Sequence, residues 1–84
     1  MNYDVDLTSA AFVDLAEIWA SSANPAEVRV AHDRIKGRLS DDPFGNGTPQ
    51  SEGLYVVEEY PLREQYEIDV PKRIVWIVSV GELP

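Results

Sequence analysis

Residues 62–81 constrain the fold of this chain more than any other segment, because they predict a β-hairpin. Side chains of a strand alternate between two faces. The apolar face of the first run carries Leu62, Tyr66, Ile68 and Val70, and the polar face carries Arg63, Gln65, Glu67 and Asp69. A short turn then leads to an apolar run over residues 74–81, the expected partner strand. Arg63 is therefore expected on the solvent-exposed face of a rigid strand.

Two amphipathic helices are predicted ahead of the hairpin. In residues 9–20 the apolar positions recur at helical spacing, with the acids on the opposite side. The apolar stripe holds Ala11, Phe12, Leu15, Ile18 and Trp19, and the acids are Asp14 and Glu17. Asn24, Pro25 and Glu27 form a start signal for a second helix over residues 25–39. The two helices are expected to form a helical hairpin.

The remaining segments complete an α+β domain of order β-α-α-β-β-β, with the helical hairpin packed on a small twisted antiparallel sheet. Residues 3–7 alternate like a short strand, residues 41–51 are dense in turn formers and predict a loop, and residues 54–57 begin a strand. At 84 residues the chain is one domain, 1–84. The expected core consists of Phe12, Leu15, Trp19, Val28, Ile35, Leu39, Tyr66, Ile68 and Trp76.

Composition excludes several kinds of site. The chain has no cysteine and one histidine, so we expect no metal site and no cofactor. Its net charge of −8 disfavours a nucleic-acid-binding surface, which normally uses clustered Lys and Arg. The basic residues cluster in the second helix, where Arg29, Arg34, Lys36 and Arg38 are expected to pair with Glu27 and Asp33. The sequence shows neither an export signal nor a membrane span, so a cytoplasmic location is expected.

Several short motifs, taken in order, resemble the RelE/ParE family of type II toxin–antitoxin toxins, which includes plasmid stabilisation proteins. They are the Asp-Pro after the second helix, Glu52-Gly53-Leu54, Pro61-Leu62-Arg63 followed by Tyr66, and the closing Val78-Ser79-Val80-Gly81. The resemblance covers nearly the whole chain. It implies the RelE/ParE fold and a cognate antitoxin protein as partner. RelE-branch toxins cleave messenger RNA on the ribosome without a metal, and ParE-branch toxins inhibit DNA gyrase.

The resemblance places two residues at family site positions. Arg63 matches the strand arginine that stabilises charge on the phosphate, and Glu52 resembles the glutamate that acts as base in one subset. Other parts are missing: Val56, Val57, Glu58 and Glu59 stand where many nucleases carry lysines, and the C-terminal arginine and acid–base residue are absent. Whether the chain is an enzyme, a metal-independent endoribonuclease if so, therefore stays open.

Each candidate also has a structural interpretation. Arg63 could pair with Glu58, Glu59 or Glu67 across the sheet, and Glu52 could be a solvated residue ahead of a strand. His32 is expected at the edge of the core with a local hydrogen bond. Trp19 and Trp76 are expected in the core, although Trp76 could stack on a base if it faces outward.

These observations leave three hypotheses for function. The first is a RelE/ParE-like toxin that acts on translation or on a protein target, with weak or no ribonuclease activity. The second is a catalytically inactive protein-interaction domain of the same fold. The third is an α+β domain that shares only the architecture. For the first, the excess of acid predicts an antitoxin that presents a basic or strongly apolar segment.

Overall fold

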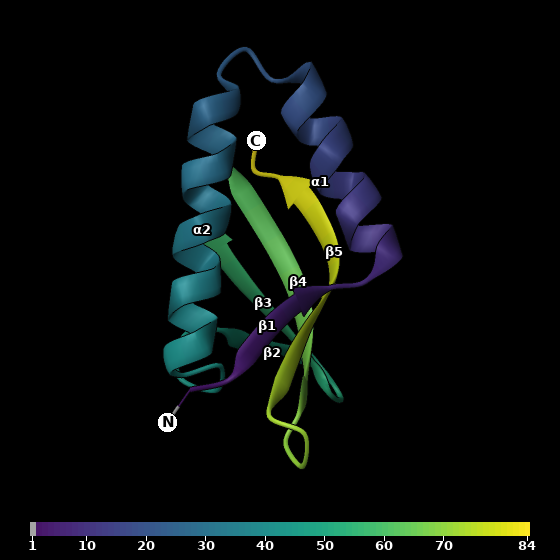
Figure 1. Cartoon of the computed structure of the whole chain (residues 1–84), viewed down its shortest axis with the longest axis vertical. Coiled ribbons are helices and arrows are strands. Elements are labelled where there is room, and N and C mark those ends of the chain that lie inside the picture. The colour runs from purple at the N-terminus through teal and green to yellow at the C-terminus, as the bar shows by residue number, and fades with distance from the viewer. Residues whose placement is uncertain (1) are drawn as a thin grey trace.

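The computed structural model describes residues 2–84, in which two helices pack on one face of a five-stranded sheet (Figure 1). The elements in chain order are β1 (Asp4–Leu7), α1 (Ser9–Ser21), α2 (Pro25–Asp41), β2 (Thr48–Ser51), β3 (Leu54–Glu59), β4 (Leu62–Asp69) and β5 (Ile74–Glu82). The α+β class, both helices and the β4–β5 hairpin agree with the sequence prediction. No helix within the described residues is long and apolar enough to cross a membrane.

Both helices begin at polar caps, as the sequence indicates. The Thr8 side chain accepts a hydrogen bond from the Ala11 backbone N–H, and the Asn24 side chain accepts one from Glu27. Such caps satisfy backbone donors that have no partner within the helix. Figure 1 shows the two helices running in opposite directions, joined at the top of the view, with strands visible between them lower down.

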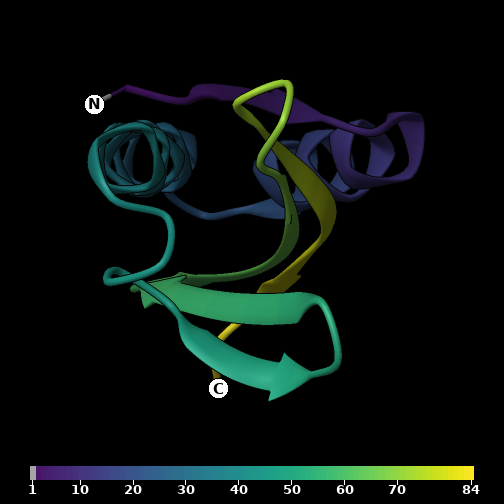
Figure 2. The same cartoon turned by 90° about the horizontal axis from the view of Figure 1, so that it is seen from below.

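The sheet has the order β1-β5-β4-β3-β2 and curls around the helices when seen along the long axis (Figure 2). The pairs from β2 to β5 are antiparallel as predicted, but β1 pairs parallel with β5, so the sheet is mixed and not wholly antiparallel as the sequence suggested. Residues 48–51, expected in a loop, form the edge strand β2. All four β2 residues are exposed and Pro49 interrupts the run, which explains why periodicity did not reveal this strand.

The core lies between the helices and the inner face of the sheet. Its buried apolar side chains are Ala11, Val28, Ala31, Ile35, Leu39, Val57, Leu62, Tyr66, Val75, Ile77 and Val80. The prediction is correct for Val28, Ile35, Leu39 and Tyr66, whereas Leu15, Ile68 and Trp76 are only partly buried.

Phe12 and Trp19 were predicted in the core and are instead 62% and 52% exposed. Asp14 was expected on the solvent-exposed side of α1. It instead turns inward, and its Oδ2 accepts a hydrogen bond from the Val80 backbone N–H at 3.1 Å. Helix α1 is apolar around most of its circumference. The helical period alone therefore does not decide which stripe faces the sheet.

The loop after α2 closes over the aromatic ring of Tyr66. The Tyr66 hydroxyl donates to the Pro43 carbonyl at 2.6 Å, and the ring stacks on that of Tyr55. Burial of the hydroxyl, with a smaller contribution from Tyr55, raises the pKa of Tyr66 from 10.0 to about 12. Tyr66 thus fixes the loop 42–47 against the sheet.

Candidate functional site

Arg63 lies on the outer face of the sheet, the face that the helices leave uncovered. It stands opposite Glu58 in β3 and Gly81 in β5. Its Nε lies 3.5 Å from Glu58 Oε2, and both side chains are partly exposed. Of the three acids considered as partners from sequence, Glu58 is the one that Arg63 contacts. Arg63 is the only lysine or arginine in β1 to β5, so the outer face has one strand cation, held beside a carboxylate.

Glu52 lies in the exposed turn between β2 and β3, away from Arg63. Arg63 pairs with Glu58 at the far end of β3, whereas Glu52 precedes Leu54 at its beginning. A strand rises about 3.3 Å per residue, so the two positions are separated by roughly four residues of strand. The structure therefore does not bring these two candidates together around one reacting phosphate.

Elsewhere on the outer face, two acids flank Trp76 and three other polar side chains are hydrogen bonded to one another. Trp76 lies between Asp6 of β1 and Glu67 of β4, which flank it in the sheet register. The two flanking carboxylates would repel the phosphates of a nucleotide whose base stacked on Trp76. The polar side chains of Gln50, Gln65 and Ser79 bond to one another: Gln65 Nε2 donates to Gln50 Oε1, and the Ser79 hydroxyl donates to Gln65 Oε1.

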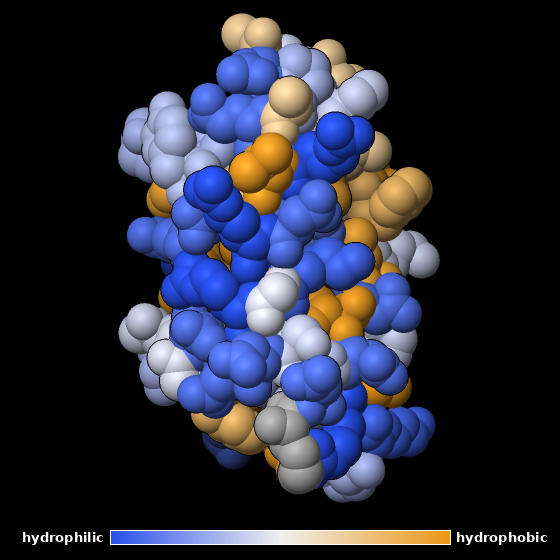
Figure 3. All heavy atoms as spheres, turned by 60° about the vertical axis from the view of Figure 1, so that its left-hand side comes forward, coloured by the Kyte–Doolittle hydropathy of each residue, from blue (hydrophilic) through white to orange (hydrophobic). Residues whose placement is uncertain are grey.

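Two cations of α2 pair with the sheet and not within the helix. Arg38 contacts Glu59 at 3.2 Å and also donates to the Glu58 carbonyl, and Arg34 lies 3.8 Å from Glu59. The sequence-based expectation of pairing with Glu27 and Asp33 is therefore wrong for these two residues. The surface on the α2 side is mostly hydrophilic in Figure 3, with hydrophobic atoms gathering toward its right-hand edge.

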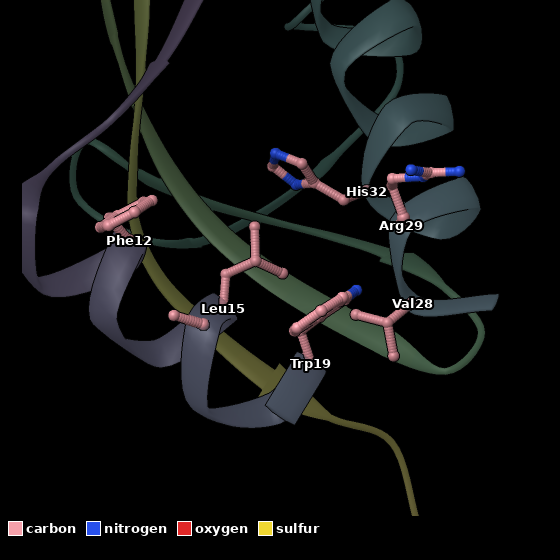
Figure 4. A pocket seen from close by; sticks show the side chains of 7 residues that line it. Phe12, Leu15, Trp19, Val28, Arg29 and His32 are labelled. Atoms are coloured by element: carbon pink, nitrogen blue, oxygen red, sulfur yellow. The ribbon is translucent and has the colours of Figure 1, made fainter. Parts of the chain in front are cut away.

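An apolar groove lies between α1 and α2. It is lined by Phe12, Leu15, Ala16, Trp19, Val28, Arg29 and His32, and has a volume of about 170 Å³. Figure 4 shows Phe12, Leu15 and Trp19 on the α1 side facing Val28 and His32 on α2, whereas the side chain of Arg29 extends away from α1. The exposed aromatic rings that sequence reasoning assigned to the core thus form one wall of this groove.

A buried polar pair lies next to the groove. His32 Nδ1 is 2.8 Å from Glu64 Oε2, and the Glu64 side chain has no exposed surface. Its second oxygen, Oε1, has no hydrogen-bond partner. The prediction that His32 makes a local bond is wrong, because its partner is 32 residues further along the chain. The sequence does contain a sign of this pair, because Glu64 is an acid on the apolar face of the alternating run 62–70.

No group of acids or histidine among residues 2–84 is arranged to hold a metal ion. The arrangement offers one paired arginine, an acidic outer face and an exposed apolar groove. Among these features, the groove is suited to contact with another protein, because exposed apolar surface of this kind marks interaction sites.

Comparison with solved structures reveals the relatives of this fold. No family model matches the chain, and no curated protein matches it. A chain of the toxin–antitoxin complex RelBE2 from Mycobacterium tuberculosis superposes with a TM-score of 0.82 at 25% identity, covering 98% of this chain and 99% of that one. The chain has the RelE/ParE toxin fold. The expectation drawn from the resemblance is thereby confirmed for the fold.

Other structures with the RelE/ParE toxin fold are more distant in sequence. The chromosomal ParDE system from P. aeruginosa matches with a TM-score of 0.70 at 16% identity, covering 98% of this chain and 97% of that one. The YoeB/ParE toxin from Agrobacterium tumefaciens matches with a TM-score of 0.69 at 15% identity, covering 96% and 99%. The similar structures include toxins solved in complex with their antitoxins.

Proposed function

We propose that this chain is the toxin-like component of a type II toxin–antitoxin pair, held by a cognate antitoxin in the cytoplasm, and that it acts by binding its target with weak or no ribonuclease activity. The observation that supports the pairing is the likeness, over 98% of the chain, to a chain of a toxin–antitoxin complex. The exposed groove between α1 and α2 offers the apolar surface that such a partner would cover.

The outer face supports the second half of the proposal. Cleavage of RNA by its own 2′-hydroxyl needs a base, an acid and cations for the charge that develops on the phosphate. Arg63 is paired with Glu58, and Glu52 lies at the other end of β3. Losing one charge-stabilising group typically lowers the rate by about 10²–10³, so a face with one paired arginine is expected to cleave RNA close to the background rate.

An inactive protein-interaction domain of the same fold is the second candidate. It is favoured by the contrast between the two surfaces: Gln50, Gln65 and Ser79 of the outer face are hydrogen bonded to one another, whereas Phe12 and Trp19 remain exposed. Such a domain would bind a partner and have no effect on growth. A target on the ribosome or on gyrase belongs to the first candidate alone.

Induction in a bacterial host separates these functions. We expect the chain alone to slow growth, co-expression of the product of a neighbouring gene to restore it, and primer extension to find no new transcript ends. Arg63→Ala, the matched control, should slow growth as the wild type does. Codon-phased cuts that vanish in Arg63→Ala would instead establish a ribonuclease. Unchanged growth together with a stable complex would favour the interaction domain.

A further inference from the structure

Two rows of side chains cross the outer face of the sheet where β5 lies between β1 and β4. Each row has an apolar side chain of β5 in the middle and an acid on either side. The rows are Asp6, Trp76 and Glu67, and Asp4, Ile74 and Asp69. Val75 and Ile77, which alternate with the two apolar residues along β5, are fully buried. The apolar residues of the rows therefore face away from the helices, and both are partly exposed.

The acids of these rows are not compensated by cations. None of the four forms an ion pair within residues 2–84. Asp6 Oδ1 accepts a hydrogen bond from the Leu7 backbone N–H, and Asp69 Oδ1 accepts one from the Lys72 backbone N–H. Because a carboxylate has two oxygens, each of these acids keeps one for a further donor. At the end of β3, by contrast, both acids contact arginines.

The basic residues of the β4–β5 hairpin belong to its two ends. Arg63 pairs with β5 five positions beyond Trp76, which is roughly 13–16 Å of strand. The guanidinium of Arg73 lies over the ring of Tyr3, 5.5 Å from its centroid, and Lys72 lies in the turn. Charges more than about 8–10 Å apart are largely screened. At Trp76, between these ends, the flanking carboxylates therefore set the local charge.

We propose that these rows bind a basic segment of a partner protein, with an arginine stacked on Trp76. Trp is the ring that attracts cations best, and a planar guanidinium stacks on it. Neighbouring strands lie about 4.8 Å apart, so Asp6 and Glu67 each stand about one strand spacing from the stacked guanidinium. In an extended segment, residues two apart have the same spacing as Ile74 and Trp76. A second cation two residues away therefore lies between the acids of the neighbouring row.

Other ligands fit these rows less well. Acids on two sides repel the phosphates of RNA. The two carboxylates of one row are separated by two strand spacings, roughly 10 Å, whereas a Ca²⁺ ion binds its oxygen ligands at about 2.3–2.6 Å. The excess of acid already predicts an antitoxin with a basic segment, and the rows give that segment a binding site. Assigning the segment to the antitoxin rests on the proposed function; its binding chemistry does not.

The fluorescence of Trp76 provides the test. The chain has two tryptophans, so Trp19→Phe leaves Trp76 as the only one, and Trp19 is exposed enough to be replaced. The probe is a short synthetic peptide that alternates arginine and threonine, titrated at about 0.15 M salt. We expect a saturable change in Trp76 emission. The lysine version of the peptide should bind about 2–5-fold more weakly, and the glutamate version should not bind.

Two double variants separate the rows from the total charge. Asp6→Asn/Glu67→Gln removes both charges beside Trp76 and should weaken binding of the arginine peptide about tenfold. Glu17→Gln/Glu27→Gln, the matched control, removes two exposed charges from the helices. It should leave the affinity within about twofold, since screening separates these charges from the rows. All four substitutions replace exposed side chains by amides of the same size, so the fold is expected to be unchanged.

Three results would overturn the proposal. They are Trp76 emission that the arginine peptide leaves unchanged, a lysine peptide that binds as tightly as the arginine peptide, and binding that Asp6→Asn/Glu67→Gln weakens no more than the helix control. Binding of the neighbouring gene product to the same double variants tests the link to the proposed function. If that product binds Asp6→Asn/Glu67→Gln as tightly as the wild type, the antitoxin holds the chain elsewhere, and the peptide result stands by itself.

Discussion

Glu64 is the one fully buried acidic residue among the described residues. It has no exposed surface, one partner in His32 and one oxygen without any. An apolar residue on β4 at this position would avoid that cost, because buried ion pairs are often no more stabilising than apolar residues of similar size. The pair is also long-range and unsuggested by local sequence.

A double-mutant cycle measures the energetic coupling between His32 and Glu64. His32→Leu should lower the free energy of unfolding by about 3 kcal/mol, because it leaves the Glu64 carboxylate buried without a partner. Combining it with Glu64→Leu should recover most of that loss. Urea unfolding of the wild type, both single variants and the double variant gives the coupling. Additive losses in the double variant would contradict a coupled pair.

Tyr66 makes stability depend on pH in the alkaline range. Its folded-state pKa of about 12 lies above the ordinary value of 10.0. Above pH 10 the unfolded chain therefore releases a proton that the folded chain keeps, and the free energy of unfolding falls as pH rises toward 12. A shift of this size corresponds to roughly 2–3 kcal/mol. Urea unfolding across this range should show a shallower decline for Tyr66→Phe; an identical decline would contradict the assignment.

Among the elements, the loop between α2 and β2 depends on a close backbone approach. A Cβ atom added at Gly47 would lie 1.8 Å from the Tyr66 hydroxyl oxygen, and one added at Gly37 in α2 would meet nothing within 4 Å. Asn46 also binds this loop to α2, because its Nδ2 donates to the Arg38 carbonyl. The loop thus closes only with a glycine beside Tyr66.

Two alanine substitutions test that closure. Gly47→Ala should lower the free energy of unfolding by about 1–3 kcal/mol, the usual cost of overpacking. Gly37→Ala, the matched control, should raise it by roughly 0.5–1 kcal/mol, since alanine favours an exposed helix. Thermal unfolding of both variants provides the measurement. Equal effects of the two substitutions would show that Tyr66 does not require the space at Gly47.

The sequence predicts elements well where the period is clear and one face is polar. This holds for α2, with its cap at Asn24, and for the β4–β5 hairpin. The sequence did not predict β2, which has no apolar alternation. It also did not predict which side of α1 packs against the sheet, because α1, which carries Phe12 and Trp19, is apolar on several sides. The sequence did not predict the partners of His32 and Arg38, and it left three possible partners for Arg63. These contacts depend on how distant elements are placed.

The whole molecule combines the RelE/ParE toxin fold with an outer face that carries acid. Glu58, Glu67 and Asp6 lie on that face, and Arg63 is its only strand cation. Nucleic-acid affinity depends on how many phosphates the protein neutralises. The charge of this face, more than its shape, is therefore what is expected to keep RNA away.

Reversing two charges tests that statement. The double variant Glu58→Lys/Glu67→Lys places two new cations beside Arg63 and removes its acidic partner. We expect the wild type to show no salt-dependent binding to single-stranded RNA, and the variant to bind with a slope of log affinity against log salt of about −2, as three phosphate contacts predict. Glu17→Lys/Glu27→Lys changes the net charge equally but on the helices, and should bind much more weakly. Equal binding by both double variants would mean that total charge, and not the outer face, governs contact with RNA.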